Sequence, residues 1–193
     1  MRIIAGLYKN RTIVTPKGLS TRPTAEKLRQ ALFNICQTYI EDAEFLDLFA
    51  GSGAMGIEAL SRGAGLATFV DGNRESVRSI RENLQALDIQ GKGIVISGDV
   101  FEQMERLATQ GRRYDIIYAD PPYDAVSYFH GLPVSYSERV VRIVDNGTLL
   151  KAGGRLFVED SADSQPVAEN LQNLKLVDTR RMGRSALQQY IMD

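Results

Sequence analysis

The residues best suited to chemistry lie together at Asp120-Pro121-Pro122-Tyr123. Each proline fixes its own φ and removes an N–H donor, and a residue before proline is held extended. The carboxylate of Asp120 and the carbonyl of Pro121 can therefore accept hydrogens from a base amine, while the ring of Tyr123 stacks on the base. These residue types indicate transfer of a group to an exocyclic amine. A rigid turn with an exposed tyrosine is the alternative.

A second candidate segment is glycine-rich: GSGAMG, at 51–56, matches the G-x-G-x-x-G pattern of nucleoside-cofactor loops. Asp71 follows 20 positions after Gly51, where an acid can accept the ribose hydroxyls. The pattern alone leaves NAD and S-adenosylmethionine open. Asp47, four positions before the loop, favours S-adenosylmethionine, because a carboxylate opposes a pyrophosphate and suits a sulfonium and an ammonium.

Alternating strands and helices must position these residues. Short apolar runs predict strands at 45–49, 66–71, 93–97 and 114–119, and apolar spacings of three and four predict helices between them. One acid lies at or near the end of each strand: Asp47, Asp71, Asp99 and Asp120. Parallel strands of such folds bind ligands beyond their carboxyl ends, so we expect the four acids around one crevice. Each acid could instead cap a helix or turn.

The rest of the chain completes the predicted sheet. A helix at 139–144, a strand at 154–159 and a helix at 167–171 follow an irregular insertion after Tyr123. The last two strands are joined by a short turn, which predicts an antiparallel final pair. The sequence therefore predicts an α/β fold with a doubly wound, mostly parallel, Rossmann-like sheet of seven strands and an antiparallel last strand.

The charge is unevenly distributed along the chain. The net charge is −1, yet residues 1–30 carry seven basic groups and one acid, and the remaining 163 residues carry a net −7. We expect residues 1–40 to form a small extension, a basic β-hairpin from RIIAG and RTIV followed by a helix, that contacts RNA. Residues 41–193 are expected to form the catalytic domain. A solvated basic face is the alternative.

Composition limits the remaining possibilities. The single cysteine, Cys36, lies in a helical pattern, which predicts a buried structural thiol in a reducing cytoplasm. No apolar run approaches the length of a membrane span. The expectation is a cytoplasmic monomer with no metal and no membrane contact.

At this point the residues resemble a known family, the bacterial ribosomal RNA small subunit methyltransferase D family. The resemblance covers most of the chain and rests on four segments: RIIAG, RPTAEKLRQALFNI, DLFAGSGAMGIEALSRGA and DPPY. It implies a class I S-adenosylmethionine-dependent fold. It also implies methylation of the N2 amine of a guanine in 16S ribosomal RNA, at the position conventionally numbered 966, in free RNA or in the small ribosomal subunit.

The resemblance also implies roles for individual residues. Asp71 would contact the ribose, and Asp99 with the Val100 backbone would lie near the adenine amino group. The full expected cofactor set is Asp47, Phe49, Gly51, Ser52, Gly53, Asp71, Gly72, Asp99 and Val100. The expected catalytic set is Asp120, Pro121, Pro122 and Tyr123. The expected RNA contacts are Arg2, Lys9, Arg11, Arg22, Thr24 and Arg29.

Several alternatives remain open. The same tetrapeptide serves amino methyltransferases of adenine N6 or cytosine N4, although the insertion after Tyr123 is too short for a target-recognition domain. A protein glutamine methyltransferase typically has asparagine at the position of Asp120. An NAD-dependent oxidoreductase would need a hydride-transfer acid or base, and the only histidine, His130, is expected in a loop. A non-catalytic RNA-binding module would leave the four acids unexplained.

Overall fold

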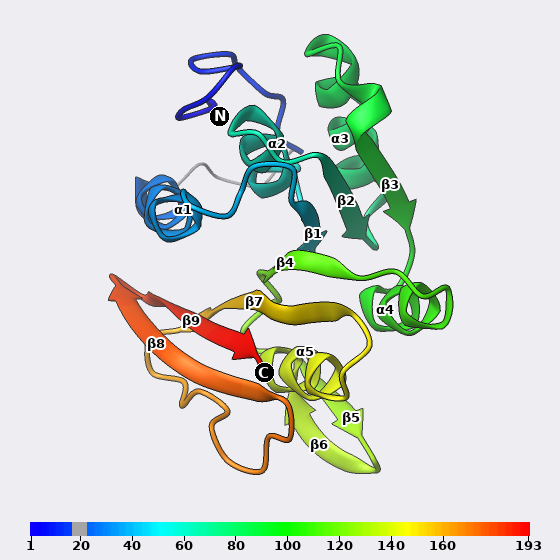
Figure 1. Cartoon of the computed structure of the whole chain (residues 1–193), viewed down its shortest axis with the longest axis vertical. Helices are drawn as coiled ribbons and strands as arrows, with labels where there is room; N and C mark the ends of the chain where they lie inside the picture. Colours follow the sequence, from blue (N-terminus) through cyan, green and yellow to red (C-terminus); the bar gives the residue numbers. More distant parts are fainter. Residues whose placement is uncertain (17–22) are drawn as a thin grey trace. The chain divides into compact units, whose positions relative to one another are not determined.

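The computed structural model describes residues 1–16 and 23–193, excluding the side chains of residues 23–25 (Figure 1). By internal contacts the chain divides into two compact units, Met1–Gln103 and Met104–Asp193, called unit 1 and unit 2 below. The expected separate extension at residues 1–40 stays a prediction.

Seven strands form the main sheet of the described residues, in the order β3-β2-β1-β4-β7-β9-β8. Their bounds are β1 Glu44–Leu48, β2 Leu66–Asp71, β3 Gly93–Ser97, β4 Tyr114–Ala119, β7 Leu150–Ser161, β8 Leu174–Met182 and β9 Ser185–Met192. β2 pairs in parallel with β1 and β3, and β4 pairs in parallel with β7. β9 is antiparallel to both β7 and β8. The predicted mostly parallel sheet with an antiparallel last strand is confirmed.

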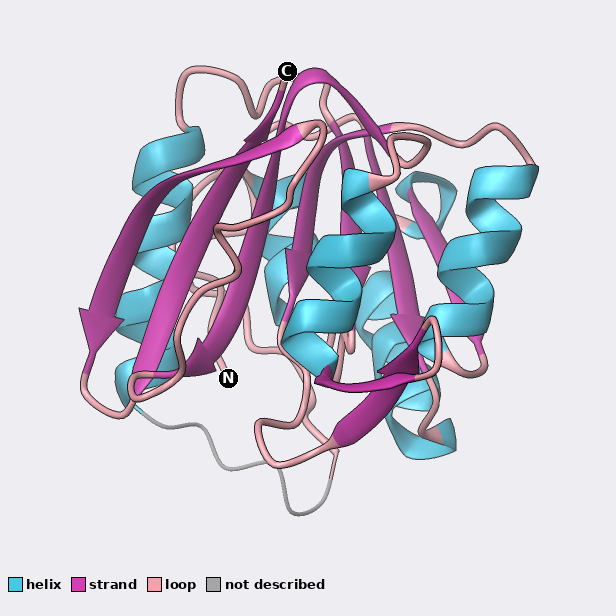
Figure 2. Ribbon diagram, turned by 90° about the horizontal axis from the view of Figure 1, so that it is seen from below, coloured by secondary structure: helices cyan, strands magenta, loops and turns pink. Residues whose placement is uncertain are grey.

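Along the chain, helices lie before, between and after the three parallel strands of unit 1. Figure 2 draws the helices in cyan and the strands in magenta. α1 is Pro23–Cys36, α2 is Ala54–Ser61, α3 is Arg74–Ala86 and α4 is Val100–Thr109, with a 3-10 turn at Gln90–Lys92. Asn73 is the N-cap of α3, and its side chain accepts the N–H groups of Glu75 and Ser76. The N–H groups of a helix's first turn have no partner within the helix, so this side chain satisfies two of them. Its buried face contains Val77, Ile80 and Leu84. Cys36, at the end of α1, is fully buried, as predicted.

Unit 2 differs from the prediction in two segments. The insertion after Tyr123 forms an antiparallel hairpin, β5 Val126–Phe129 with β6 Leu132–Ser135, before α5 at Tyr136–Asp145. His130 lies in the turn of this hairpin. The helix predicted at 167–171 is absent. Part of the reason is Asp145, whose buried carboxylate accepts the N–H groups of residues 172–174 and draws that backbone away from helical bonding.

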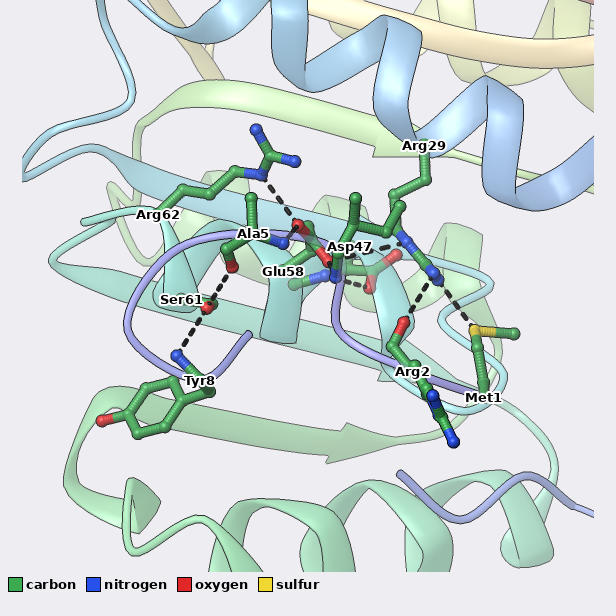
Figure 3. A network of polar contacts seen from close by, with 11 residues as sticks. Met1, Arg2, Ala5, Tyr8, Arg29, Asp47, Glu58, Ser61 and Arg62 are labelled. Atoms are coloured by element: carbon green, nitrogen blue, oxygen red, sulfur yellow. Dashed lines mark hydrogen bonds and ion pairs between the residues drawn. The ribbon is translucent and has the colours of Figure 1, made fainter. Parts of the chain in front are cut away.

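The first residues of unit 1 also differ from the predicted hairpin. The two expected strands are reduced to one isolated bridge between Arg2 and Thr12. Backbone bonds still cross the segment, from the N–H of Ile3 to the carbonyl of Arg11 and from the N–H of Ile13 to the carbonyl of Met1. Side chains of α2 hold it as well (Figure 3). Glu58 accepts the N–H groups of Ile4 and Ala5 at 2.8 and 3.0 Å, so these two backbone donors are bonded to a helix.

Candidate active site

The glycine-rich loop connects β1 to α2. Gly53 has φ 76°, in the left-handed region, at the residue that precedes α2. A Cβ on Gly56 would lie 2.3 Å from the ring of Phe69 in β2, so only glycine allows α2 to pack this closely on the strand. The loop also positions Phe49, whose ring lies edge-on to Phe101 at a centroid distance of 5.9 Å. The sequence pattern therefore reports a close helix–strand approach.

We expected Asp47 to line an open crevice, but it does not. Its side chain is 1% exposed, and Oδ2 accepts the N–H of Gly56 in the first turn of α2 at 2.9 Å. A carboxylate at this place stabilises a helix N-terminus, which carries partial positive charge. The chain reaches this arrangement because Asp47 is the penultimate residue of β1 and α2 begins six residues after that strand ends. We therefore assign Asp47 a structural role, in which its buried carboxylate holds the glycine-rich loop against the start of α2.

Asp71 ends β2 and joins two loops. Its Oδ2 accepts the N–H of Gly51 at 2.7 Å, and its Oδ1 accepts the N–H of Asn73 at 2.7 Å. The carboxylate is nearly buried, at 9% exposure. An ionised carboxylate has about four acceptor sites, so these two bonds leave acceptor capacity for the hydroxyls of a ribose. Gly72, which lies between Asp71 and Asn73 in the chain, is exposed.

Asp99 and Val100 lie after β3. The Oδ1 of Asp99 accepts the N–H groups of Phe101 and Glu102 at 3.0 and 3.1 Å, which caps α4. The residue is exposed, whereas Val100 is buried. The capping role considered for Asp99 is thus present, and the exposed carboxylate remains open to a second contact.

Two carboxylates together set the electrostatics of the loop. A pyrophosphate is bound by N–H groups at a helix N-terminus. Here the N–H of Gly56 is bonded to Asp47, and the N–H of Gly51 is bonded to Asp71. The same two groups place negative charge around the loop. This arrangement disfavours a pyrophosphate and favours a cofactor whose reactive end is cationic.

Unit 2 contains the Asp120–Tyr123 corner. It follows directly from β4, and Asp120 and Tyr123 both reach the surface, whereas Pro121 is buried. The hydroxyl of Tyr123 donates to Glu159 at 2.9 Å and lies 3.0 Å from the hydroxyl of Ser185. The ring is thus fixed at its far end while 37% of the residue stays exposed.

The ionisation of this corner is unusual. Asp120 reaches solvent, yet the protein atoms around it, together with the negative charge of Glu159, raise the pKa of its carboxyl to about 8. Desolvation also raises the pKa of the Tyr123 hydroxyl, which therefore stays a donor at neutral pH. The corner can hold a proton on Asp120 or release it within the physiological range.

Comparisons with known proteins identify the family. The family model described as "Conserved hypothetical protein 95" matches residues 1–191. A Bacillus subtilis protein, "Putative rRNA methyltransferase YlbH", is 37% identical over 123 residues, 64% of this chain and 67% of its own length. A Haemophilus influenzae protein named "Ribosomal RNA small subunit methyltransferase D" is 31% identical over 177 residues, which are 91% of this chain and 86% of that protein. The chain belongs to the ribosomal RNA small subunit methyltransferase D family.

A solved structure agrees with this assignment. "Putative methyltransferase yhhF from Escherichia coli" superposes with a TM-score of 0.81 at 31% identity, covering 100% of this chain and 98% of that one. The resemblance inferred from the sequence segments is confirmed. The two chains therefore share one fold over their whole length.

The expected RNA contacts of this family member fall into three groups. Arg2, Lys9 and Arg11 are exposed, and Arg11 also donates to the carbonyl of Ala86 at 3.0 Å. Arg22 lies outside the described residues, and Thr24 is in α1 but its side chain is not described. Arg29 is 3% exposed, so the expectation of a phosphate contact at Arg29 does not match its position. It donates to the carbonyl of Arg2 at 2.9 Å and pairs with Glu58 at 3.7 Å (Figure 3).

Three residues of this methyltransferase D family member were missed in the sequence. Glu58 holds the N-terminal segment, and Glu159 holds Tyr123. Asn83, 2% exposed, donates to the carbonyls of Val14 and Ser52 and so ties the N-terminal segment to the glycine-rich loop. For Glu58 and Glu159 the one available signal was a polar residue among apolar neighbours, and it does not reveal the distant partner. Asn83 lies among the many polar residues of α3 and gave no such signal.

Two searches of the described residues gave negative results. None of the helices there is both long enough and apolar enough to cross a membrane. No cluster of three or more His, Cys, Asp or Glu side chains that could hold a metal ion occurs in residues 1–16 and 23–193.

Proposed function

We propose that this protein transfers a methyl group from S-adenosylmethionine to the N2 amine of a guanine in 16S ribosomal RNA, at the position conventionally numbered 966. The observation that carries the choice of cofactor is the pair of carboxylates, Asp47 and Asp71, that occupy the N–H groups of the glycine-rich loop. The names of the relatives support ribosomal RNA as the substrate. The guanine and its position come from the family resemblance.

The cofactor set fits S-adenosylmethionine. When bound, this cofactor supplies a methyl group on a sulfonium, which leaves with the S–C bond electrons as a neutral thioether. Asp71 retains acceptor capacity for the ribose hydroxyls, and the exposed Asp99 can accept from the adenine amino group. The N–H of Asn73, bonded to Asp71, keeps that carboxylate oriented. Gly51 and Gly53 allow close approach of the backbone to the methionine part.

The Asp120–Tyr123 corner would act on the target base. An exocyclic amine is a poor nucleophile because its lone pair is delocalised into the ring. Ionised Asp120 and the Pro121 carbonyl accept its two hydrogens, which localises the lone pair on nitrogen. Tyr123 stacks on the base and fixes its plane. After methyl transfer the nitrogen carries a positive charge and releases one proton to Asp120.

Most of the acceleration would come from positioning. Holding the amine at attack distance can supply about 7–11 kcal/mol of the barrier, and the acceptors add stabilisation of the charge that develops on nitrogen. A base in folded RNA is stacked, so the target must be unstacked before it reaches Asp120. Exposed Arg2, Lys9 and Arg11 would then hold flanking phosphates.

The decisive experiment maps the methylated nucleotide. Small ribosomal subunits from a strain lacking this gene are incubated with the protein and isotope-labelled S-adenosylmethionine, and the RNA is analysed by mass spectrometry. We expect one N2-methylguanine, at the position numbered 966. Wild-type subunits, already methylated, are the control and should accept no label. Label on adenine N6 or cytosine N4 would replace the proposed base, and absence of transfer to either RNA or subunits would refute the proposal.

The basic N-terminal residues give a separate prediction. Changing Arg2 and Lys9 together to glutamine should weaken RNA binding and lower the slope of log K against log salt concentration by about 1.5, since each lost phosphate contact removes about 0.7–0.9. Fluorescence titration of a labelled RNA at several salt concentrations measures this slope. The matched control is Arg81 and Lys92 changed to glutamine, an equally exposed pair in the same unit. If the Arg81 and Lys92 variant lowered the slope as much as the Arg2 and Lys9 variant, the N-terminal residues would not be a specific RNA contact.

A further inference from the structure

Glu159 lies in β7 with an unusual set of partners. Its carboxylate is 8% exposed and accepts two phenol hydroxyls, from Tyr118 in β4 at 2.8 Å and from Tyr123 at 2.9 Å. Among the ion pairs of the described residues, none includes Glu159. Two neutral donors therefore compensate this buried acid where a cation is the usual partner.

This arrangement does not favour stability. Taking a carboxylate out of water is expensive, and apolar residues of similar volume often replace buried charges without loss of stability. Tyr118 is fully inside the protein and serves as one donor. The other donor, Tyr123, belongs to the Asp120–Tyr123 corner. The buried acid thus links the core strands β4 and β7 to a surface ring.

The Tyr123 side chain is restrained at both ends. Its backbone follows two prolines, which fix their own φ angles. Its hydroxyl, at the far end of the ring, is bonded to Glu159 and lies 3.0 Å from the hydroxyl of Ser185 in β9. A ring restrained at both ends loses less conformational entropy when a base stacks on it.

We propose that Glu159 is a positioning residue of the Asp120–Tyr123 corner, holding the Tyr123 ring in the orientation that receives the target base and setting the charge beside Asp120. This inference rests on the proposed function. Glu159 acts through Tyr123 and Asp120 and does not touch the reacting atoms. The hydroxyl bond fixes the ring, and the negative charge raises the proton affinity of the Asp120 carboxylate.

The groups that face Asp120 define the charge effect. Within unit 2, Glu159 from β7 is the charged group that acts on it, and Tyr123 is the ionisable hydroxyl nearby. Ser185 from β9 and Tyr118 from β4 contact the same cluster through their hydroxyl groups. Removing the charge of Glu159 should therefore lower the pKa of Asp120, and the pH at which the corner becomes active should fall.

Three variants separate the two effects. Tyr123→Phe keeps the ring and the charge but removes the hydroxyl bond. Glu159→Gln removes the charge but keeps an amide that can accept from one hydroxyl and donate to the other. Tyr190→Phe is the matched control, because it removes another buried hydroxyl of unit 2, bonded to Gln188 at 2.9 Å, away from this cluster. Thermal unfolding and S-adenosylmethionine binding check that all three remain folded.

The kinetic test uses small ribosomal subunits from a strain lacking this gene. Tyr123→Phe should lower kcat roughly tenfold without moving the pH profile, because the ring loses its bond to a charged group while the charge of Glu159 stays. Glu159→Gln should move the rising limb of the profile to lower pH. Tyr190→Phe should change neither. Wild-type kcat in Tyr123→Phe together with an unmoved profile in Glu159→Gln would overturn the inference.

A second measurement needs no RNA. NMR of tyrosine-labelled protein gives the couplings between Hα and the two Hβ atoms of Tyr123, which report whether its χ1 angle stays in one rotamer. We expect one rotamer in the wild type and averaging over several rotamers in Glu159→Ala, because the hydroxyl bond holds the far end of the ring. Equal couplings in the two proteins would refute the positioning role even if the enzyme is active. Conversely, a wild type that methylates no RNA but keeps one Tyr123 rotamer, lost in Glu159→Ala, would refute the proposed function and leave the positioning of Tyr123 supported.

Discussion

Replacing Asp120 with alanine is expected to abolish methyl transfer and leave the affinity for S-adenosylmethionine unchanged. The carboxylate is the group proposed to accept a hydrogen of the target amine and then its proton, and losing such a group costs about a hundredfold or more in rate. The residues expected to hold the cofactor, including Asp71 and Asp99, belong to residues 1–103 and make their own contacts there. Label transfer to small subunits measures the first effect, and calorimetry measures the second.

The control for this change is Asp124→Ala, since Asp124 is an exposed acid four residues further along the same loop. It should keep wild-type turnover. Asp120→Asn distinguishes two functions of the carboxylate: its carbonyl oxygen can still accept a hydrogen bond, but it cannot take the proton. Turnover retained in Asp120→Ala would remove this residue from the mechanism.

The raised pKa of Asp120 gives the sign of the pH dependence. Only the ionised carboxylate accepts the amine hydrogens, so the rate should rise with pH through a pKa of about 8. The folded state binds this proton more tightly than the unfolded state, whose carboxyl has the ordinary pKa of 3.8. The contribution to stability is therefore complete below that ordinary value and is lost as the pH rises to about 8. Urea unfolding at several pH values should show that Asp120→Ala removes the dependence of stability on pH in this range.

The sequence predicted the features that depend on local pattern. Apolar spacing located the helices of unit 1, and the cap of α3 is equally local, because the side chain of Asn73 bonds only two and three residues away. The Asp120–Tyr123 corner was recognised because its rigidity is a property of the prolines themselves. The antiparallel end of the sheet followed from a short turn between its last two strands.

The features that were wrong or missed depend on contacts between distant residues. Asp47 was expected to line a cofactor crevice, but it is buried and bonds to Gly56, nine positions away in the first turn of α2. Arg29 was expected to be a surface charge, but it is buried and pairs with Glu58 on another helix. Glu159 meets Tyr123 across 36 positions, and no local pattern reveals that contact. Side-chain partners at such separations are fixed only when the sheet forms.

The same reasoning explains why the N-terminal hairpin was overestimated. Two short strands alone are marginally stable. Here some backbone bonds cross the segment, such as that from Ile3 to Arg11, whereas the donors of Ile4 and Ala5 are satisfied by a side chain of α2. Glu58 accepts the N–H groups of Ile4 and Ala5 and the Nε of Arg62, the last at 2.8 Å, and also pairs with Arg29 (Figure 3). One buried carboxylate therefore substitutes for part of a partner strand.

Glu58→Ala is expected to destabilise the protein by about 3–5 kcal/mol, because removing one partner of a buried ion pair leaves the other charge uncompensated. Arg29 would remain buried, and two backbone N–H groups would lose their acceptor. Urea unfolding measures the free energy, and hydrogen exchange should show lost protection at Ile4 and Ala5. The N-terminal segment carries Arg2 and Lys9, so RNA binding should weaken along with it.

Glu82→Ala is the matched control. Glu82 also forms an ion pair with an arginine four positions away, at 2.7 Å to Arg78, but its side chain is 45% exposed. Exposed pairs contribute about 0–1 kcal/mol, so this variant should lie close to the wild type. Both variants remove one glutamate from one helical pair, so their difference measures the burial of Glu58 together with its contacts to Ile4, Ala5 and Arg29. If Glu58→Ala were as stable as Glu82→Ala, the N-terminal segment would have to be held mainly by its other contacts, those of Ser61 and Asn83 with its backbone.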